Sequence, residues 1–245
     1  MLTKDAALKE RADKRKVAQG TLIENSHLPP SDNLAIRTLF DLGGRLKLPT
    51  FPVIYLTGAP ATGKSTLSKN LAAKFPELRV FAYSDELRRH LAHRAQSVLT
   101  EDSIGELSAK VVTSEDIVAL DAQLVDRVRV ERAEAPFLID SHPVTKEDYG
   151  FLVTAFNVET IRALNPDVIV CLYTSPEVLL ERIRLTPMGR PMVREFEAKM
   201  HIDLQAGVAT QYGILLGKPV YLIDSSISQS DLVATVAARA RLDGG

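Results

Sequence analysis

The stretch that most constrains this chain covers residues 52–71 and reads PVIYLTGAPATGKSTLSKNL. An apolar, β-branched run ends at Gly58, and a loop of small residues then leads into a helical pattern. From Gly58 to Ser65 the string fits G-x-x-x-x-G-K-[ST] in the strand–loop–helix setting that this motif requires. Glycines and small neighbours let successive backbone N–H groups turn inward, and the following helix adds the positive end of its dipole. The stretch therefore predicts a phosphate-binding loop rather than a fortuitous glycine-rich turn.

Each part of this loop has an expected role toward a nucleotide. Lys64 can reach β- and γ-phosphate oxygens, and the Ser65 hydroxyl can hold Mg²⁺. Nine residues are expected to bind the nucleotide: Gly58, Ala59, Pro60, Ala61, Thr62, Gly63, Lys64, Ser65 and Thr66. We therefore expect the chain to bind a nucleoside triphosphate, ATP first, together with Mg²⁺.

Size and charge restrict the remaining function classes. A chain of 245 residues can bury one large core, and a formal net charge of −1 provides no global basic field for nucleic acid or anionic membrane. Nucleic acid is therefore not favoured as a partner, although a local basic cluster leaves it open. Assembly into a homo-oligomer is also left open. The single cysteine, Cys171, lies in an apolar strand pattern and is interpreted as core filler rather than a nucleophile. With no possible intrachain disulfide, no apolar run of 18 residues and a charged N-terminus, we expect a cytoplasmic protein.

Strand and helix patterns alternate from residue 52 onward, which is typical of a parallel sheet with helices on both faces. The predicted strands are Pro52–Thr57, Arg79–Tyr83, Phe137–Asp140, Asp167–Tyr173 and Pro219–Ile223. Helix starts are predicted at Ser175-Pro176-Glu177, a cap followed by an N1 proline and an acid, and at Ser228, with Asp231 three residues later. Residues 1–50 are expected to form an N-terminal helical extension, either a solvated arm or an arm for a partner. Residues 51–245 are expected to form one α/β domain, a three-layer P-loop NTPase sandwich with a five-stranded parallel sheet.

Polar residues follow these strands at the edge where a parallel sheet binds its ligands. Asp140 ends an apolar strand and could bind Mg²⁺ beside Ser65, or could cap a helix. His142, two residues later, is expected to donate a hydrogen bond to the substrate or to anchor its loop. Asp85 could contact the phosphoryl acceptor or cap a helix. Arg88, one turn later, could hold an acceptor phosphate or simply be exposed.

The second strong signal is the arginine segment, residues 182–194, which reads RIRLTPMGRPMVR. Phosphoryl transfer requires positive charge on the γ-phosphoryl oxygens, and guanidinium groups fit them well. A short segment rich in arginine and jointed by glycine and proline is typical of a closing lid, while a basic surface loop is the alternative. We expect Arg190, with Arg184, to act with Lys64 in catalysis. No protein nucleophile is needed, because the acceptor attacks in line.

From about Phe51 to Ile223 the chain resembles the archaeal-type adenylate kinases, within the nucleoside monophosphate kinase group of P-loop proteins. The resemblance is carried by the phosphate loop, Ile139-Asp140-Ser141-His142, LNPDVIV at 164–170, the arginine segment, His201, and QYGILLG at 211–217. It implies reversible transfer of the ATP γ-phosphoryl group to AMP with Mg²⁺, on a five-stranded parallel core with a short arginine-rich lid.

Three features depart from that group. The SDELR stretch at 84–88 is more similar to the broader set of P-loop small-molecule and polynucleotide kinases. Ala206 stands where the archaeal enzymes are expected to carry arginine, and residues 1–50 have no counterpart. The leading hypothesis is therefore a nucleoside monophosphate kinase with AMP as acceptor. A P-loop kinase for another small molecule or an RNA end, and a nucleotide-dependent regulatory module, remain the alternatives.

Overall fold

The computed structural model describes residues 50–96, 112–185 and 194–242, and their core is a five-stranded parallel sheet with strand order β2-β3-β1-β6-β7. The strands are β1 (Val53–Gly58), β2 (Arg79–Ala82), β3 (Phe137–Asp140), β6 (Val168–Tyr173) and β7 (Val220–Asp224). Each lies within one residue of its predicted bounds at either end. The predicted α/β class and five-stranded parallel sheet are confirmed. One correction is that Tyr83, predicted as a strand residue, is the first residue of a helix.

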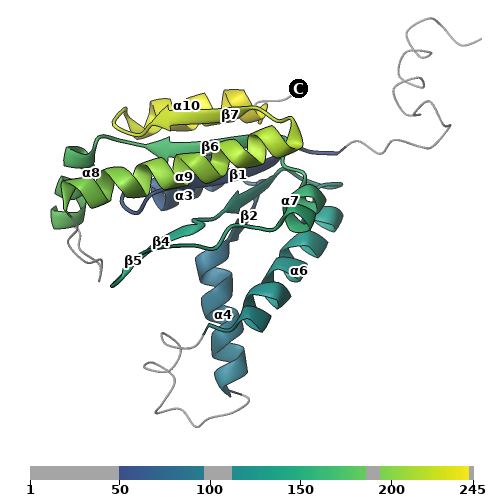
Figure 1. Ribbon diagram of the computed structural model, residues 1–245. Helices are drawn as coiled ribbons and strands as arrows, with labels where there is room; N and C mark the ends of the chain where they lie inside the picture. The colour runs from purple at the N-terminus through teal and green to yellow at the C-terminus, as the bar shows by residue number, and fades with distance from the viewer. Residues whose placement is uncertain (1–49, 97–111, 186–193, 243–245) are drawn as a thin grey trace, which may run out of the picture. The chain divides into compact units, whose positions relative to one another are not determined.

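Helices cover both faces of the sheet, as the three-layer prediction requires (Figure 1). Alternate residues of β1 point to opposite faces: Val53 and Tyr55 belong to one core cluster, and Ile54 and Leu56 to the other. The first cluster is closed by α6 (Ser114–Glu131), α7 (Val158–Leu164) and α9 (Glu195–Leu216), and the second by α3 (Lys64–Lys74) and α10 (Gln229–Ala240). Cys171 lies in the first cluster with 1% of its surface exposed, and burial raises the pKa of its thiol to about 12. It is core filler, as predicted.

The helix ends follow the local signals in the sequence. α8 (Pro176–Leu185) begins at the predicted Ser175-Pro176 step. The Ser228 hydroxyl accepts the Asp231 N–H at 3.1 Å, so the predicted start of α10 is also correct. Helix ends are decided by contacts between residues three apart, which a single sequence displays directly.

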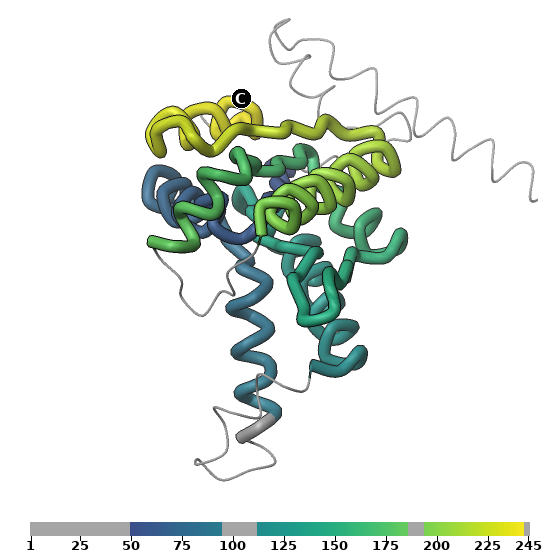
Figure 2. The backbone as a smooth tube through the Cα atoms, turned by 60° about the vertical axis from the view of Figure 1, so that its left-hand side comes forward, coloured from purple at the N-terminus to yellow at the C-terminus, as the bar shows by residue number. Residues whose placement is uncertain are grey.

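Beside the sheet lie a helix pair and a hairpin. α4 (Tyr83–Gln96) runs next to α6 (Figure 1). β4 (Val144–Glu147) and β5 (Gly150–Val153) form an antiparallel hairpin, and β4 packs against α9 (Figure 2). The hairpin was not predicted, because only Val144 of its eight strand residues is buried and no alternating pattern results.

Two predicted features lie outside the described residues. These are the N-terminal extension, apart from Thr50, and residues 186–193 of the arginine segment, which include Arg190. Within the described ranges, none of the helices combines the length and apolar character needed to span a membrane.

Candidate active site

The loop between β1 and α3 is a closed turn with little room for larger residues. Both the hydroxyl and the N–H of Thr62 donate to the Ala59 carbonyl, at 2.8 and 3.2 Å. A Cβ at Gly58 would lie 2.8 Å from the Leu172 carbonyl oxygen, so the approach of the loop to β6 requires glycine. Gly63, with φ of 88°, adopts a left-handed conformation immediately before α3. The motif thus takes a strand–turn–helix form in the structure.

Lys64 and Asp140 meet at the mouth of this loop. The parallel register pairs Leu56 of β1 with Asp140 of β3, which brings the carboxylate beside the end of β1. Lys64 Nζ forms an ion pair with Asp140 Oδ1, and only 13% and 6% of the two side chains are exposed. Partial burial strengthens such a pair, because less water screens the charges.

The residues at this position fit a magnesium ion that arrives with a nucleotide. Ser65 and Thr66 are exposed in the first turn of α3. Mg²⁺ is usually held by one or two carboxylates together with substrate phosphates, and Asp140 with Ser65 would supply the protein part of that set. Within the described ranges, no cluster of three His, Cys, Asp or Glu side chains could hold a metal unaided.

His142 lies in the loop that follows β3 and is neutral near pH 7. Burial, then Lys64, then His201 lower the pKa of its imidazole to about 4. A neutral imidazole can donate one hydrogen bond and accept another. This state suits either of the predicted roles, contact with the substrate or anchoring of the loop.

The same loop is tied to α9 by two side chains: His201, which is among the residues that carry the family resemblance, and Gln205, which the sequence did not single out. The Val144 carbonyl accepts a hydrogen bond from Gln205 Nε2 at 3.2 Å and lies 2.9 Å from His201 Nε2. Gln205 Oε1 in turn accepts the hydroxyl of Thr57 at 3.0 Å. The only signal for this role in the sequence was that Gln205 is a polar residue on the apolar side of a helix.

The described arginines of the arginine segment divide into different environments. Arg182 donates to the Ala61 carbonyl at 3.3 Å, and to the hydroxyl and carbonyl of Ser225 at 3.1 and 2.8 Å. It therefore connects the phosphate loop to the segment after β7. Arg184 lies on the exposed side of α8 and pairs with Glu181 at 2.9 Å. Arg194 precedes α9 and pairs with Glu197.

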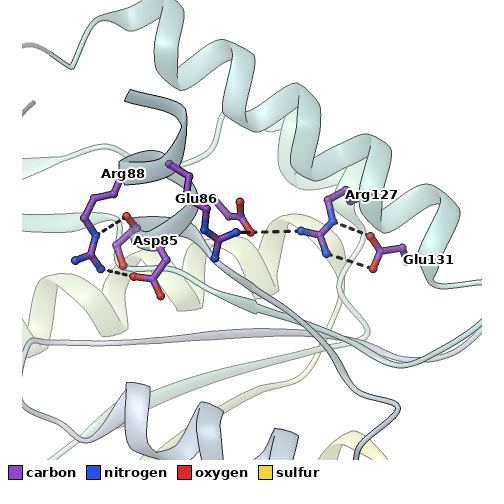
Figure 3. Close-up of polar contacts among 7 residues, drawn as sticks. Asp85, Glu86, Arg88, Arg127 and Glu131 are labelled. Carbon is purple, nitrogen blue, oxygen red and sulfur yellow. Dashed lines mark hydrogen bonds and ion pairs between the residues drawn. The ribbon is translucent and has the colours of Figure 1, made fainter. Parts of the chain in front are cut away.

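Asp85 and Arg88 are close together on α4, where they form an ion pair (Figure 3). Because α4 begins at Tyr83, Asp85 lies within the first turn rather than at the cap position. Arg127 of α6 lies between two carboxylates (Figure 3). Its guanidinium is 3.5 Å from Glu86 and 2.7 Å from Glu131. These contacts hold the start of α4 against α6.

Aromatic rings pack beneath the start of α4. Tyr83 and Phe156 meet edge to face with centroids 5.8 Å apart, and Tyr55 meets Tyr212 at 5.4 Å. The Tyr83 hydroxyl donates to Asp121 at 2.8 Å, and burial raises the pKa of that carboxyl. The start of α4 is thus fixed to the same face of the sheet as α9.

The AAA domain family matches residues 57–199 in sequence, which is more than half of the chain. The chain belongs to this family. No curated protein sequence matches this chain.

The solved structures that resemble this chain in fold include a shikimate kinase and the YorR protein. A shikimate kinase from Acinetobacter baumannii in complex with shikimate has a TM-score of 0.50 at 16% identity, and the match covers 80% of this chain and 96% of that one. The YorR protein from Bacillus subtilis in complex with phosphorylated GDP has a TM-score of 0.50 at 15% identity, with 78% and 96% covered. The fold is that of the P-loop kinases, and these likenesses do not single out adenylate kinases.

Proposed function

We propose that this chain is an ATP- and Mg²⁺-dependent phosphotransferase that moves the γ-phosphoryl group to a nucleoside monophosphate, with AMP as the first acceptor. The contact between Lys64 and Asp140 beside the closed phosphate loop carries the proposal. A lysine that can follow the phosphates and a carboxylate suited to Mg²⁺ stand together at the carboxyl edge of the sheet. That edge is where open parallel sheets bind their ligands.

The chain's own residues would act by position and charge. The backbone from Gly58 to Ser65 would hold the phosphates, and Lys64 would leave Asp140 for the β- and γ-phosphate oxygens. Asp140 and Ser65 would hold Mg²⁺, which supplies charge neutralisation when it is bound. Arg190 and Arg184 would neutralise charge on the γ-phosphoryl group as it passes to the acceptor.

The acceptor would lie between the His142 loop and the start of α4. Arg88 is 75% exposed and Asp85 is 49% exposed, and exposed ion pairs contribute only about 0–1 kcal/mol. Arg88 can therefore exchange its carboxylate for an acceptor phosphate at small cost. The resemblance of the 139–142 and 211–217 stretches to archaeal-type adenylate kinases favours AMP.

A second candidate is a kinase whose acceptor is another small molecule or an RNA end. Asp85, half exposed in the first turn of α4, could accept a hydrogen bond from an attacking hydroxyl. The shikimate kinase that shares the fold was solved with shikimate, a molecule other than a nucleotide. Transfer to a hydroxyl would use the same phosphate loop with a different acceptor subsite.

An acceptor panel separates these candidates. Calorimetry with millimolar Mg²⁺ should first show heat of ATP binding, and its absence with well-folded protein contradicts the whole proposal. Labelled ATP is then offered with AMP, the other nucleoside monophosphates, small hydroxyl-bearing metabolites and a 5′-hydroxyl RNA. Label in ADP made from AMP supports the first candidate, label in another acceptor supports the second, and release of phosphate without transfer contradicts both.

A further inference from the structure

One buried amide on α9 joins the end of β1, which leads into the phosphate loop, to the start of β4, which follows the His142 loop. Gln205 has no exposed surface, and its side chain uses both of its polar ends. Oε1 accepts the hydroxyl of Thr57, the residue before the first glycine of the phosphate loop. Nε2 donates to the carbonyl of Val144, two residues beyond His142.

This connection depends on complete hydrogen bonding. Thr57 is fully buried, and Val144 is fully buried as well. A buried donor or acceptor left without its partner costs about 1–3 kcal/mol. A shift of either loop relative to α9 would break at least one of these bonds, so the relative placement of the loops is strongly determined.

α9 also begins beside Arg194, the last residue of the arginine segment. Glu197 in the first turn of this helix lies 3.7 Å from Lys146 of β4, and His201 one turn later lies 2.9 Å from the Val144 carbonyl. One helix thus contacts Arg194, the hairpin and the strand that enters the phosphate loop.

We propose that Gln205, supported by His201, is a positioning residue that sets the His142 loop against the phosphate loop and so aligns the acceptor with the donor phosphate. This inference rests on the proposed phosphoryl transfer. An apolar side chain would fill the same space, but it would leave the buried Thr57 hydroxyl without its acceptor. The amide instead connects segments 148 and 61 residues away in the chain.

The first test compares Gln205→Met with Gln211→Met, which removes an exposed glutamine from the same helix. Gln205→Met should lower kcat by about 10- to 100-fold, because small misplacements of reacting groups are costly in rate. The Kd for ATP should stay near the wild-type value, and Gln211→Met should change neither. Unchanged kcat, or a parallel loss of kcat and ATP affinity, overturns the proposal.

The second test asks whether Thr57 and Gln205 act as one unit. Thr57→Val removes the hydroxyl at constant shape and should lower kcat, whereas Thr57→Ser should retain most of it. In the Gln205→Met background, Thr57→Val should add almost nothing, since the shared bond is already lost. Additive losses would show independent roles and overturn the inference.

A third measurement does not depend on activity. Hydrogen–deuterium exchange in the peptide that covers residues 141–144 should become faster in Gln205→Met, while the β6 and β7 peptides keep wild-type rates. Equal exchange in that loop contradicts positioning by Gln205. If the wild-type protein transfers phosphate to no acceptor, the proposed function fails, and the exchange result still decides whether Gln205 holds the loop.

Discussion

Lys64 Nζ at the start of α3 contacts Asp140 Oδ1 at the end of β3, across a separation of 76 residues in the chain. The two charges compensate each other in a site where little of either side chain is exposed. A bound polyphosphate would offer the lysine a second set of oxygens at the same place. Lys64 and Asp140 are accordingly the first positions at which the proposed chemistry can be tested.

Replacing Lys64 with alanine should abolish most of the transfer activity. Loss of one preorganised cationic contact to the transferring group is expected to lower kcat by at least about 100-fold. Steady-state kinetics with labelled ATP measure the effect, and circular dichroism checks the fold. Lys69→Ala, on the exposed side of α3, serves as the matched control. Near-normal transfer by Lys64→Ala would rule out the role given to this lysine.

Asp140→Asn should raise the Mg²⁺ concentration needed for half-maximal activity and lower kcat. The amide keeps the shape of the carboxylate but loses the charge that hard cations prefer. A magnesium titration of the initial rate measures both effects. Asp126→Asn, an exposed carboxylate on α6, is the control. If the titration curve does not move, Asp140 does not hold the metal.

Arg182→Ala should weaken ATP binding by about 10- to 100-fold. Its guanidinium donates to the carbonyls of Ala61 and Ser225, and hydrogen bonds from charged groups contribute about 1.5–3 kcal/mol. The phosphate loop would lose its connection to the segment after β7. Calorimetry gives the Kd, and Arg162→Ala on the exposed face of α7 is the control. An unchanged Kd would show that the loop keeps its shape without Arg182.

Asp116 should make the stability depend on pH in the acid range. The backbone N–H of Thr113 is the largest cause that lowers the pKa of this carboxyl to about 2. A pKa that is lower in the folded than in the unfolded state stabilises the fold above about pH 4, and the contribution disappears as pH falls toward about 2.

The measurement is the free energy of unfolding in urea for wild type and Asp116→Asn. The difference between them should be largest near neutral pH and should shrink at about pH 3. Asp126→Asn provides the control for an exposed carboxylate. A difference that stays constant between these two conditions would contradict the linkage.

Two glycines of α9 should respond to alanine in opposite directions. A Cβ at Gly213 would lie 2.1 Å from Val220 Cγ2 and 3.1 Å from the Lys218 carbonyl oxygen. Gly213→Ala should therefore destabilise the protein by about 1–3 kcal/mol, which is typical of overpacking. Gly207→Ala meets nothing within 4 Å and should stabilise it by about 0.4–1 kcal/mol. Thermal unfolding of both variants measures the two changes in Tm. Equal changes in Tm would contradict the prediction and would show that α9 can move away from β7.

Much of the fold could be predicted from local patterns. The five strands of the sheet, the start of α8 at Ser175-Pro176 and the cap at Ser228 all agree with the structure. The hairpin of β4 and β5 could not be predicted, because its turn and its exposed side chains show no period of two. Tyr83 was predicted in the second strand, but it begins α4, where its half-buried ring contacts Phe156 and its hydroxyl donates to Asp121.

The sequence by itself determined the phosphate loop, the parallel sheet and the edge at which the polar residues meet. Spacing within a few residues specifies turns and helix ends, and the period of the apolar residues specifies strands. Only the tertiary structure decided that Arg182 contacts the phosphate loop and that Gln205 connects Thr57 to Val144. These contacts join residues more than 60 positions apart, and their geometry depends on how α8 and α9 pack on the sheet, which no local spacing contains.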